Sequence, residues 1–454
     1  MVAAFSLTLA IVTGIVSGVA PAFAAIRTSV NETLKEGGRT GTSGAGHARL
    51  RSGLVIAEIA VALILLAASG LLLRSFENMR EADLGYRPDH TLVASYSLPR
   101  KQYSTQPAVD QFNQDLLRRL QALPGVSSVG LTSFLPANGT QGNSAIVAEG
   151  YVPSKPGTID LASPIQIEGD YFRAIGTPLL RGRFFTPADN AKAQLVVIVN
   201  HTLAQQSWPG QNPIGKRMRI GTPEMQTPWA TIVGEVADVK EGSPDANPRQ
   251  QYYGPIEQAE SLYGSLGNPA TDLNGNGGYI TLRTSLPPEL MEKQLLSTVR
   301  SLDPQLPLTQ MQTMTHAISD SEAPRRFNTI LISSFAAAAL LLAILGIYSV
   351  IAFTVAMRVH EMAIRMALGS QRSGIVGLVL ASGLKLAAAG CIIGLAGAIA
   401  ASRLLKTFVF GVSTLDPLVL VAAAFLVLML AMAASLLPAR RAASINPMKA
   451  LRAE

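Results

Sequence analysis

The residue types that usually carry enzyme chemistry are scattered along this sequence rather than clustered. The single cysteine, Cys391, cannot form an intrachain disulfide or a cysteine-based metal site. No pair of the five histidines has the spacing of metal ligands. These are His47, His90, His201, His316 and His360. No G-x-S-x-G segment, the turn that exposes a nucleophilic serine in hydrolases, occurs either. The sequence therefore predicts neither an enzyme nor a metal or other cofactor.

One segment, residues 210–217, nearly matches the phosphate-binding loop G-x-x-x-x-G-K-[ST]. Its last position should supply a hydroxyl group for magnesium, but Arg217 stands there. A phosphate loop also follows a strand and opens a helix, whereas Trp208-Pro209 precedes this one and residues 218–220 have the pattern of a strand. We therefore predict a structural turn here and not a nucleotide site.

The composition is that of a membrane protein with a large polar insertion. Apolar residues make up 48% of the 454 residues and charged residues 15%, against about a quarter in an ordinary soluble domain. This balance argues against a disordered chain and against a single soluble domain. Five stretches are long and apolar enough to cross a bilayer as helices, which takes about 20 residues each.

The short loops set the orientation, because cytoplasmic loops of membrane proteins are rich in Lys and Arg. These residues are frequent in 27–52, 358–372 and 438–454 and sparse in 402–416. The net charge of +7 is thereby explained, so it does not indicate a nucleic-acid partner. The predicted organisation starts with a transmembrane helix in 1–26, a cytoplasmic linker at 27–52 and a second transmembrane helix at 53–73. An extracytoplasmic domain follows at 74–325. Three transmembrane helices lie within 326–437 (about 327–357, 374–401 and 417–437), with a cytoplasmic loop at 358–372 and a cytoplasmic tail at 438–454.

Two exits from the membrane resemble each other. In residues 21–35, which follow the first membrane helix, Pro-Ala is followed by Ser-Val-Asn. In residues 438–449, which follow the last membrane helix, Pro-Ala is followed by Ser-Ile-Asn. We expect the first helix to be the end of a preceding repeat unit in a longer, duplicated parent whose N-terminal part is missing. Chance similarity is the alternative, since short matches are weak evidence. Residues 21–24 also resemble a signal-peptide cleavage site, although no Lys or Arg precedes the helix.

The extracytoplasmic domain is predicted to be α+β and to form two lobes. The pattern at each end of the domain predicts a strand–helix–strand unit, and two further strands are predicted between these units. The predicted strands are 91–98, 126–134, 195–200, 231–236, 279–283 and one near 308, and the predicted helices are 109–123 and 287–301. The lobes are joined through 135–165 and 240–278, and the second joint, rich in Gly, Asn and Pro, is predicted to be a mobile loop.

Two charges, Glu58 and Lys385, fall inside predicted membrane helices. A charge at the bilayer centre costs about 2.5–3.5 kcal/mol on insertion scales, so each is a functional candidate. Glu58 lies near the cytoplasmic end of its helix, where water relieves much of that cost. A role in packing is therefore favoured over a role in proton transfer.

The loop at 358–372 contains a short amphipathic helix pattern. Glu361 and Arg365 form an i,i+4 pair, and Val359, Met362 and Met366 form an apolar stripe at i, i+3 and i+7. Gly369 is in position to end the helix. Such a helix suits docking into a groove of a partner, where methionine adapts its shape. The alternative interpretation is that this segment is only a charged turn between two membrane helices.

At this point the sequence resembles a known family, the MacB/FtsX-type ABC transporter permeases. Its coupling segment is similar to the run Arg358-x-x-Glu361-x-Ala363-Ile364-Arg365-x-Ala367-Leu368-Gly369-Ser370. The family's C-terminal signature is similar to residues 437–452, and its periplasmic core domain to 170–173, 182–185 and 208–217. Met362 and Ala363 stand where Ile and Gly are commoner in the family.

The resemblance implies a membrane α-helical bundle with a large extracytoplasmic α+β domain of the MacB periplasmic core type, in the inner membrane of a bacterium. It implies a permease subunit of an efflux or mechanotransmission complex, in which a separate MacB-type ATP-binding subunit docks on the coupling helix. Glu361, Met362, Ile364, Arg365 and Gly369 are then the docking residues. It also implies a dimer of permease units and leaves a periplasmic adaptor and an outer-membrane channel open as partners.

Two other functions remain as alternatives. One is a membrane-anchored sensor or scaffold, whose outer domain binds a ligand without ATP-driven motion. The other is a secondary transporter driven through Glu58 and Lys385, which fits poorly with so large an external domain.

Overall fold

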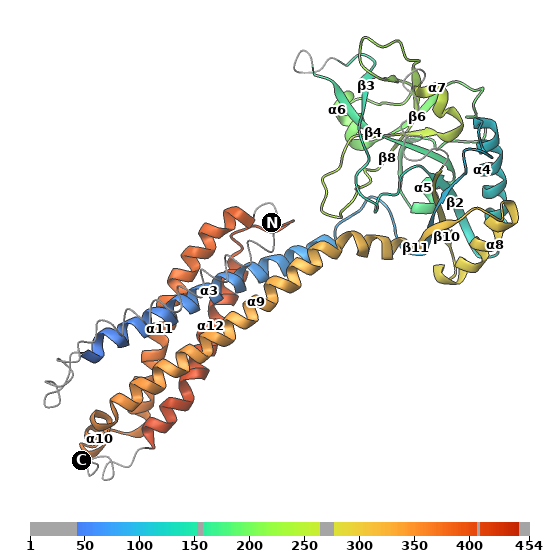
Figure 1. Cartoon of the computed structure of the whole chain (residues 1–454). Helices are drawn as coiled ribbons and strands as arrows, with labels where there is room; N and C mark the ends of the chain where they lie inside the picture. Colours follow the sequence, from blue (N-terminus) through green and yellow to red (C-terminus); the bar gives the residue numbers. More distant parts are fainter. Residues whose placement is uncertain (1–42, 152–157, 264–276, 406–408, 445–454) are drawn as a thin grey trace. The chain divides into compact units, whose positions relative to one another are not determined.

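The computed structural model describes residues 43–151, 158–263, 277–405 and 409–444 of the chain (Figure 1). They divide into a membrane unit, whose described residues are 43–68, 333–404 and 415–444, and an extracytoplasmic unit, whose described residues lie within 69–332 and 405–414. The helices are α3 (Ser43–Arg80), α4 (Gln106–Gln121), α5 (Tyr171–Ile175), α6 (His201–Ser207), α7 (Ala259–Tyr263), α8 (Glu292–Leu302), α9 (Met314–Met357), α10 (Val359–Ala367), α11 (Arg372–Leu405) and α12 (Pro417–Ala443), with 3-10 helices η1 (Ile256–Gln258) and η3 (Pro288–Met291).

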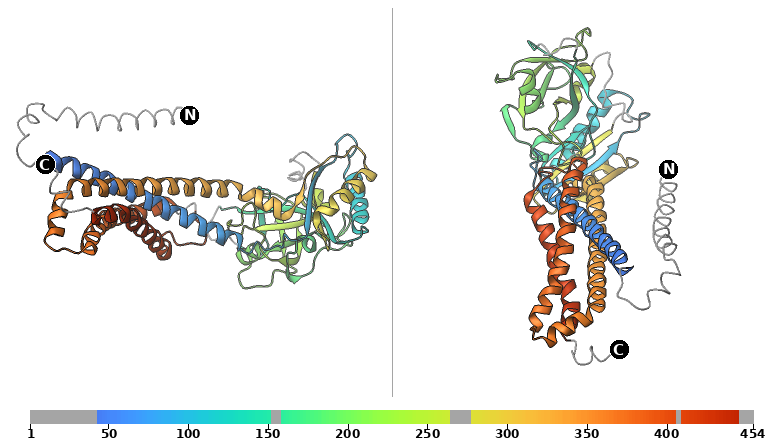
Figure 2. Two further views of the ribbon diagram at one scale, coloured as in Figure 1. Left: turned by 90° about the horizontal axis from the view of Figure 1, so that it is seen from below. Right: turned by 90° about the vertical axis from the view of Figure 1, so that its left-hand side faces the viewer.

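Four helices of the described chain are long and apolar enough to cross a membrane, and they appear as the long coils of Figures 1 and 2. Their spans are Leu50–Arg80, Met314–Met357, Arg372–Ser402 and Pro417–Ala443. The stretches predicted from the sequence at 53–73, 327–357, 374–401 and 417–437 lie inside these helices. The helix predicted in 1–26 lies outside the described residues.

Small residues bring α3 and α11 close together within the membrane unit. A Cβ atom added at Gly390 would lie 2.6 Å from the Cβ of Ile59, and one added at Gly394 would lie 2.8 Å from a methyl group of Leu63. Ile59 and Leu63 are fully buried. Without a hydrophobic effect between helix and lipid, such close backbone approach supplies much of the attraction between membrane helices.

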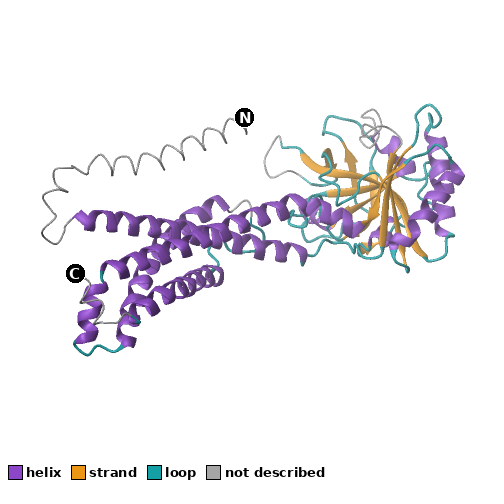
Figure 3. Ribbon diagram, turned by 60° about the horizontal axis from the view of Figure 1, so that its bottom comes forward, coloured by secondary structure: helices purple, strands orange, loops and turns teal. Residues whose placement is uncertain are grey.

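The extracytoplasmic unit is built on one continuous sheet, drawn in orange in Figure 3. The strand order is β11-β1-β10-β2-β4-β3-β7-β8-β6-β9, and β5 pairs with β8. A parallel pairing of β4 with β9 closes the second half of this path into a ring of six strands. The strands are β1 (Thr91–Ser97), β2 (Val126–Thr132), β3 (Ser144–Ala148), β4 (Asp160–Gly169), β5 (Leu179–Gly182), β6 (Val196–Asn200), β7 (Arg217–Ile220), β8 (Ala230–Val236), β9 (Gln251–Pro255), β10 (Gly277–Thr284) and β11 (Leu308–Thr313).

Helices α4 and α8 cover one face of the four strands β11, β1, β10 and β2 (Figure 1). Leu116 and Leu120 of α4 and Leu295 of α8 are buried in a core shared with these strands. Helix α5 packs against β2 and β10. Its close approach requires Gly130 in β2, because a Cβ atom there would lie 2.3 Å from the Cα of Tyr171.

The prediction of a mobile joint at 240–278 is wrong over part of its length, and residues 264–276 of it lie outside the described residues. Residues 251–255 form β9, which pairs with β4 and β6 and is completely buried. The other predicted joint, 135–165, contains β3 and the start of β4. The domain therefore has two ends with separate cores but a sheet that runs through both of them.

Residues 410–411 are bonded to α3 within the extracytoplasmic unit. These contacts are here called the stalk contact. The backbone N–H of Phe410 donates to Ser75 Oγ at 2.7 Å, and Asn78 Nδ2 donates to the carbonyl of Gly411 at 2.9 Å. The Lys240 ammonium lies 5.4 Å from the centre of the Phe410 ring. The segment between α11 and α12 is thus bonded to α3.

Candidate functional site

Helix α10 carries the predicted docking residues. Its amphipathic sequence is supported by the Glu361–Arg365 pair, whose side chains meet at 2.6 Å and are each about half exposed (49% and 48%). Pairs of this spacing and order stabilise an exposed helix by about 0.3–0.5 kcal/mol. The pair therefore holds two exposed side chains in position but adds little to the stability of the protein.

Gly369 ends α10 as the sequence predicts. Its φ is +97°, and the N–H groups of Gly369 and Ser370 bond to the carbonyls of Met366 and Arg365 at 3.1 and 2.9 Å. These two bonds form a Schellman motif, which satisfies the last carbonyls of a helix. A Cβ at Gly369 would meet nothing within 4 Å, so the backbone conformation, and not lack of space, favours glycine.

Met362, one of the predicted docking residues, does not lie on the exposed surface of α10. Met362 is 4% exposed and Ala363 is fully buried, and both face the membrane unit. Val359 and Met366 are half-buried on the same face, and Met362 and Met366 pack in the core of that unit. The apolar stripe therefore fixes the helix to its own bundle.

The opposite face of α10 is open. Ile364 is 42% exposed and Leu368, directly after the helix, is 83% exposed, and Glu361 and Arg365 lie beside them. Two exposed aliphatic side chains next to an ordered charge pair are a suitable docking surface. Leu368 was not singled out from the sequence, because it falls outside the i, i+3, i+7 stripe.

The two intramembrane charges are not brought together by any ion pair in the described part of the chain. Glu58 of α3 places its carboxylate against Gly346 of α9, where a Cβ would lie 2.5 Å from Glu58 Oε2. Lys385 is exposed on α11. Glu58 is otherwise exposed, so its packing role stays a prediction.

The near-match to a phosphate loop forms a turn. Strand β7, and not a helix, follows it. Arg217 is bonded to Glu149, and the Lys216 ammonium lies 5.7 Å from the centre of a Trp208 ring. Among the described residues, no group of three His, Cys, Asp or Glu side chains could hold a metal ion.

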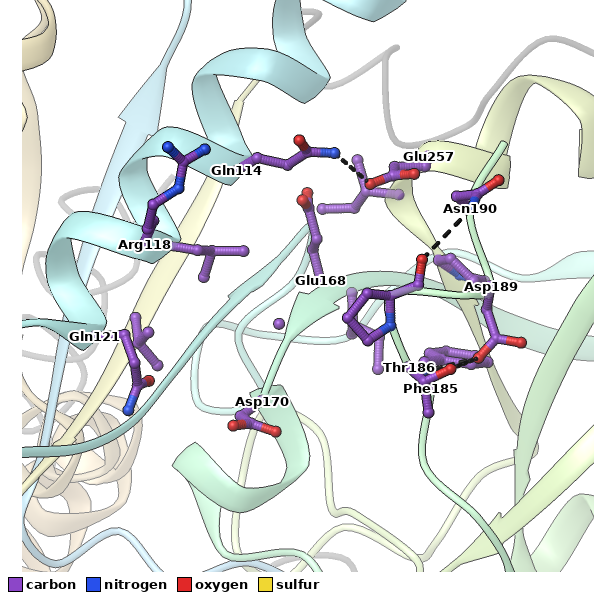
Figure 4. A pocket seen from close by; sticks show the side chains of 17 residues that line it. Gln114, Arg118, Gln121, Glu168, Asp170, Phe185, Thr186, Asp189, Asn190 and Glu257 are labelled. Carbon is purple, nitrogen blue, oxygen red and sulfur yellow. Dashed lines mark hydrogen bonds between the residues drawn. The ribbon is translucent and has the colours of Figure 1, made fainter. Parts of the chain in front are cut away.

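A pocket of about 700 Å³ in the extracytoplasmic unit was missed from the sequence (Figure 4). It lies between α4, the end of β4, the segment 185–190 and η1. No motif marks it, because five segments far apart in the chain, Val129 of β2 among them, contribute its lining. Burial, together with the nearby Glu257 carboxylate, raises the pKa of Glu168 in this pocket to about 8.

The two units also match two known domain families. A family model described as the MacB-like periplasmic core domain matches residues 52–296, and one described as the FtsX-like permease C-terminal domain matches 333–447. The chain belongs to the MacB/FtsX-type ABC transporter permeases. It is a multi-pass membrane protein, and its large MacB-like domain is periplasmic.

Curated relatives of this permease include exporters. It is 24% identical over 302 residues to the macrolide export ATP-binding/permease protein MacB of Agrobacterium fabrum, with 64% of this chain and 43% of that protein covered. It is 27% identical over 307 residues to the pyoverdine export ATP-binding/permease protein PvdT of Pseudomonas syringae pv. syringae, with 66% and 44% covered. The chain thus spans somewhat under half the length of these two relatives.

Among solved structures, the periplasmic region of MacB from Actinobacillus actinomycetemcomitans matches with a TM-score of 0.35 and 17% identity. That match covers 55% of this chain and 98% of the solved one. The extracellular domain of the transporter YknZ from Gram-positive bacteria matches with a TM-score of 0.28 and 14% identity, covering 46% and 88%.

Proposed function

We propose that this permease is driven by a separate MacB-type ATP-binding subunit, which docks on α10 and converts ATP hydrolysis into movement of the periplasmic domain. The observation that carries the proposal is the two-faced geometry of α10. One face is locked into the membrane unit by Met362 and Ala363, and the other presents Ile364, Leu368 and the Glu361–Arg365 pair. A force applied to the open face is therefore passed to the bundle.

The proposal extends to the type of complex. The relatives named for macrolide and pyoverdine export support an efflux role for this chain. A second permease unit completes the proposed assembly. A sensor or scaffold without ATP-driven motion is the rival function, and it requires no docking surface on α10.

Exchanging the two charges of α10, Glu361→Arg together with Arg365→Glu, tests the docking role. The internal ion pair survives, so the helix remains formed, but both charges of the pair are reversed toward the partner. Like charges at an interface cost several kcal/mol, so we expect the stimulation of the ATP-binding subunit to fall by about ten-fold or more. ATPase activity is measured with the purified permease in lipid nanodiscs.

The exposed pair Glu149–Arg217 of the periplasmic domain provides the matched control. Its exchange, Glu149→Arg together with Arg217→Glu, reverses the same number of charges away from α10 and should leave ATPase stimulation intact. Full stimulation in the α10 exchange would refute the docking role and favour a sensor or scaffold.

The side of the membrane on which α10 lies can be tested by cysteine labelling. The only native cysteine, Cys391, is buried, so a Cys391→Ala variant gives a clean background. We expect Ser370→Cys, next to α10, to react with a membrane-impermeant maleimide only from the cytoplasmic side. Ser97→Cys in β1 should react only from the periplasmic side. Reaction of both from the same side would contradict the proposed coupling.

A further inference from the structure

The pocket in the periplasmic domain combines an apolar wall with two carboxylates, Glu168 and Glu257, that no ion pair joins to a base within the residues that the structure describes. Leu117, Ile167, Phe185 and Ile256 are among its apolar lining residues. Ligand pockets for small organic molecules commonly have about 300–1,000 Å³ and such a mixed lining. The volume of about 700 Å³ falls within that range.

Glu168 and Glu257 are held in place by amides and not by cations. Asn113 Nδ2 donates to Glu168 Oε2 at 3.2 Å, and Gln114 Nε2 donates to Glu257 Oε1 at 2.8 Å. Asn113 is 1% exposed and accepts a bond from the Tyr96 hydroxyl at 3.0 Å. These bonds fix the orientation of Glu168, which Figure 4 shows among the side chains that line the pocket.

The other charged residues of the pocket are already paired. Arg118 is bonded to Asp115 at 2.9 Å, Asp170 to Arg173 at 3.2 Å, and Asp189 to Arg183 at 2.7 Å. In the described part of the chain, no ion pair joins Glu168 or Glu257 to a base. Burial, and the Glu257 and Glu260 carboxylates, also raise the pKa of nearby Asp110. Once Glu168 is ionised, which happens above a pH of about 8, the field at this end of the pocket is therefore negative.

We propose that the pocket binds an organic cation with an apolar body, its charged group lying between Glu168 and Glu257 and its body on the wall around Phe185 and Ile256. A positive group between two mutually repelling carboxylates removes their repulsion, and the apolar wall excludes hydrated metal ions. The proposal is independent of ATP and of docking on α10, because it concerns binding to the permease alone.

The test uses ethidium, a permanent aromatic cation, and the full chain in uncharged detergent micelles free of nucleic acid. Fluorescence polarisation measures binding, with empty micelles as the blank. We expect saturable ethidium binding and none of fluorescein, an anion with a similar polycyclic aromatic body. Glu168→Gln and Glu257→Gln should each weaken ethidium binding by about ten-fold at pH 9, as expected for loss of one charge-assisted contact. Glu289→Gln, an exposed carboxylate outside the pocket, should leave it unchanged.

The pH dependence gives a second readout. Glu168 is mostly protonated at pH 7, since its folded pKa is about 8, and it must ionise to attract the cation. Ethidium binding should therefore tighten by about ten-fold between pH 7 and pH 9 in the native chain, and not in Glu168→Gln. Equal binding of ethidium and fluorescein, or equal affinities of Glu168→Gln and Glu289→Gln, would overturn the proposal.

Discussion

Replacing Leu368 by glutamate should strongly weaken stimulation of the ATP-binding subunit while the permease still folds and inserts. Leu368 is 83% exposed, so the change disturbs nothing inside the membrane unit. In a complex, however, it places a charge where an aliphatic side chain would be desolvated. Central interface positions cost about 2 kcal/mol or more when altered, so affinity should fall by roughly 30-fold or more. The measurement is the dependence of ATPase rate on subunit concentration.

Leu290→Glu is the matched control for this substitution. Leu290 is 65% exposed in the periplasmic domain, so the same chemical change is made on another surface. The control should keep native ATPase stimulation. If Leu368→Glu also keeps it, the open face of α10 is not the docking surface.

Replacing Gly130 by valine should strongly destabilise the periplasmic domain. The new Cβ would lie 2.3 Å from the Cα of Tyr171, so α5 would have to move as a whole. Overpacking of this kind costs up to about 3 kcal/mol. For a domain of this size we expect Tm to fall by about 6–12 °C.

The two tryptophans of the chain make this measurement specific. Trp208 and Trp229 both lie in the periplasmic domain, so tryptophan fluorescence reports its unfolding without a signal from the membrane helices. Gly142→Val is the control, because a Cβ at Gly142 meets nothing within 4 Å. Equal Tm values for the two variants would show that α5 does not need to pack closely on β2.

The regular elements of the domain were predictable where local pattern and burial agree. The strands β1, β6 and β8 are rich in Val, Ile and other β-formers, and the sequence places them to within one or two residues. β9 was missed, because Gln251–Pro255 contains glutamine, glycine and proline and is stabilised by the strands on both sides of it. β9 is buried because it pairs with β4 and β6, which are distant in the sequence, and a short stretch of sequence does not show such pairing.

The site was predictable in position but not in orientation. The sequence gives the charge pair of α10 and its terminating glycine, and both have the predicted geometry. An apolar stripe shows that one face is to be buried, but not whether its partner is another protein or the same chain. Here α10 buries Met362 in its own bundle. The pocket was beyond prediction, because its lining comes from segments up to 143 residues apart, such as Gln114 and Glu257.

The stalk contact ties two passages of the chain together inside the extracytoplasmic unit. The chain enters that unit through α3, and residues 405–414 return to it between α11 and α12. Because Ser75 and Asn78 of α3 hold residues 410 and 411, a displacement of this returning segment is passed to α3 through two hydrogen bonds as well as along the backbone.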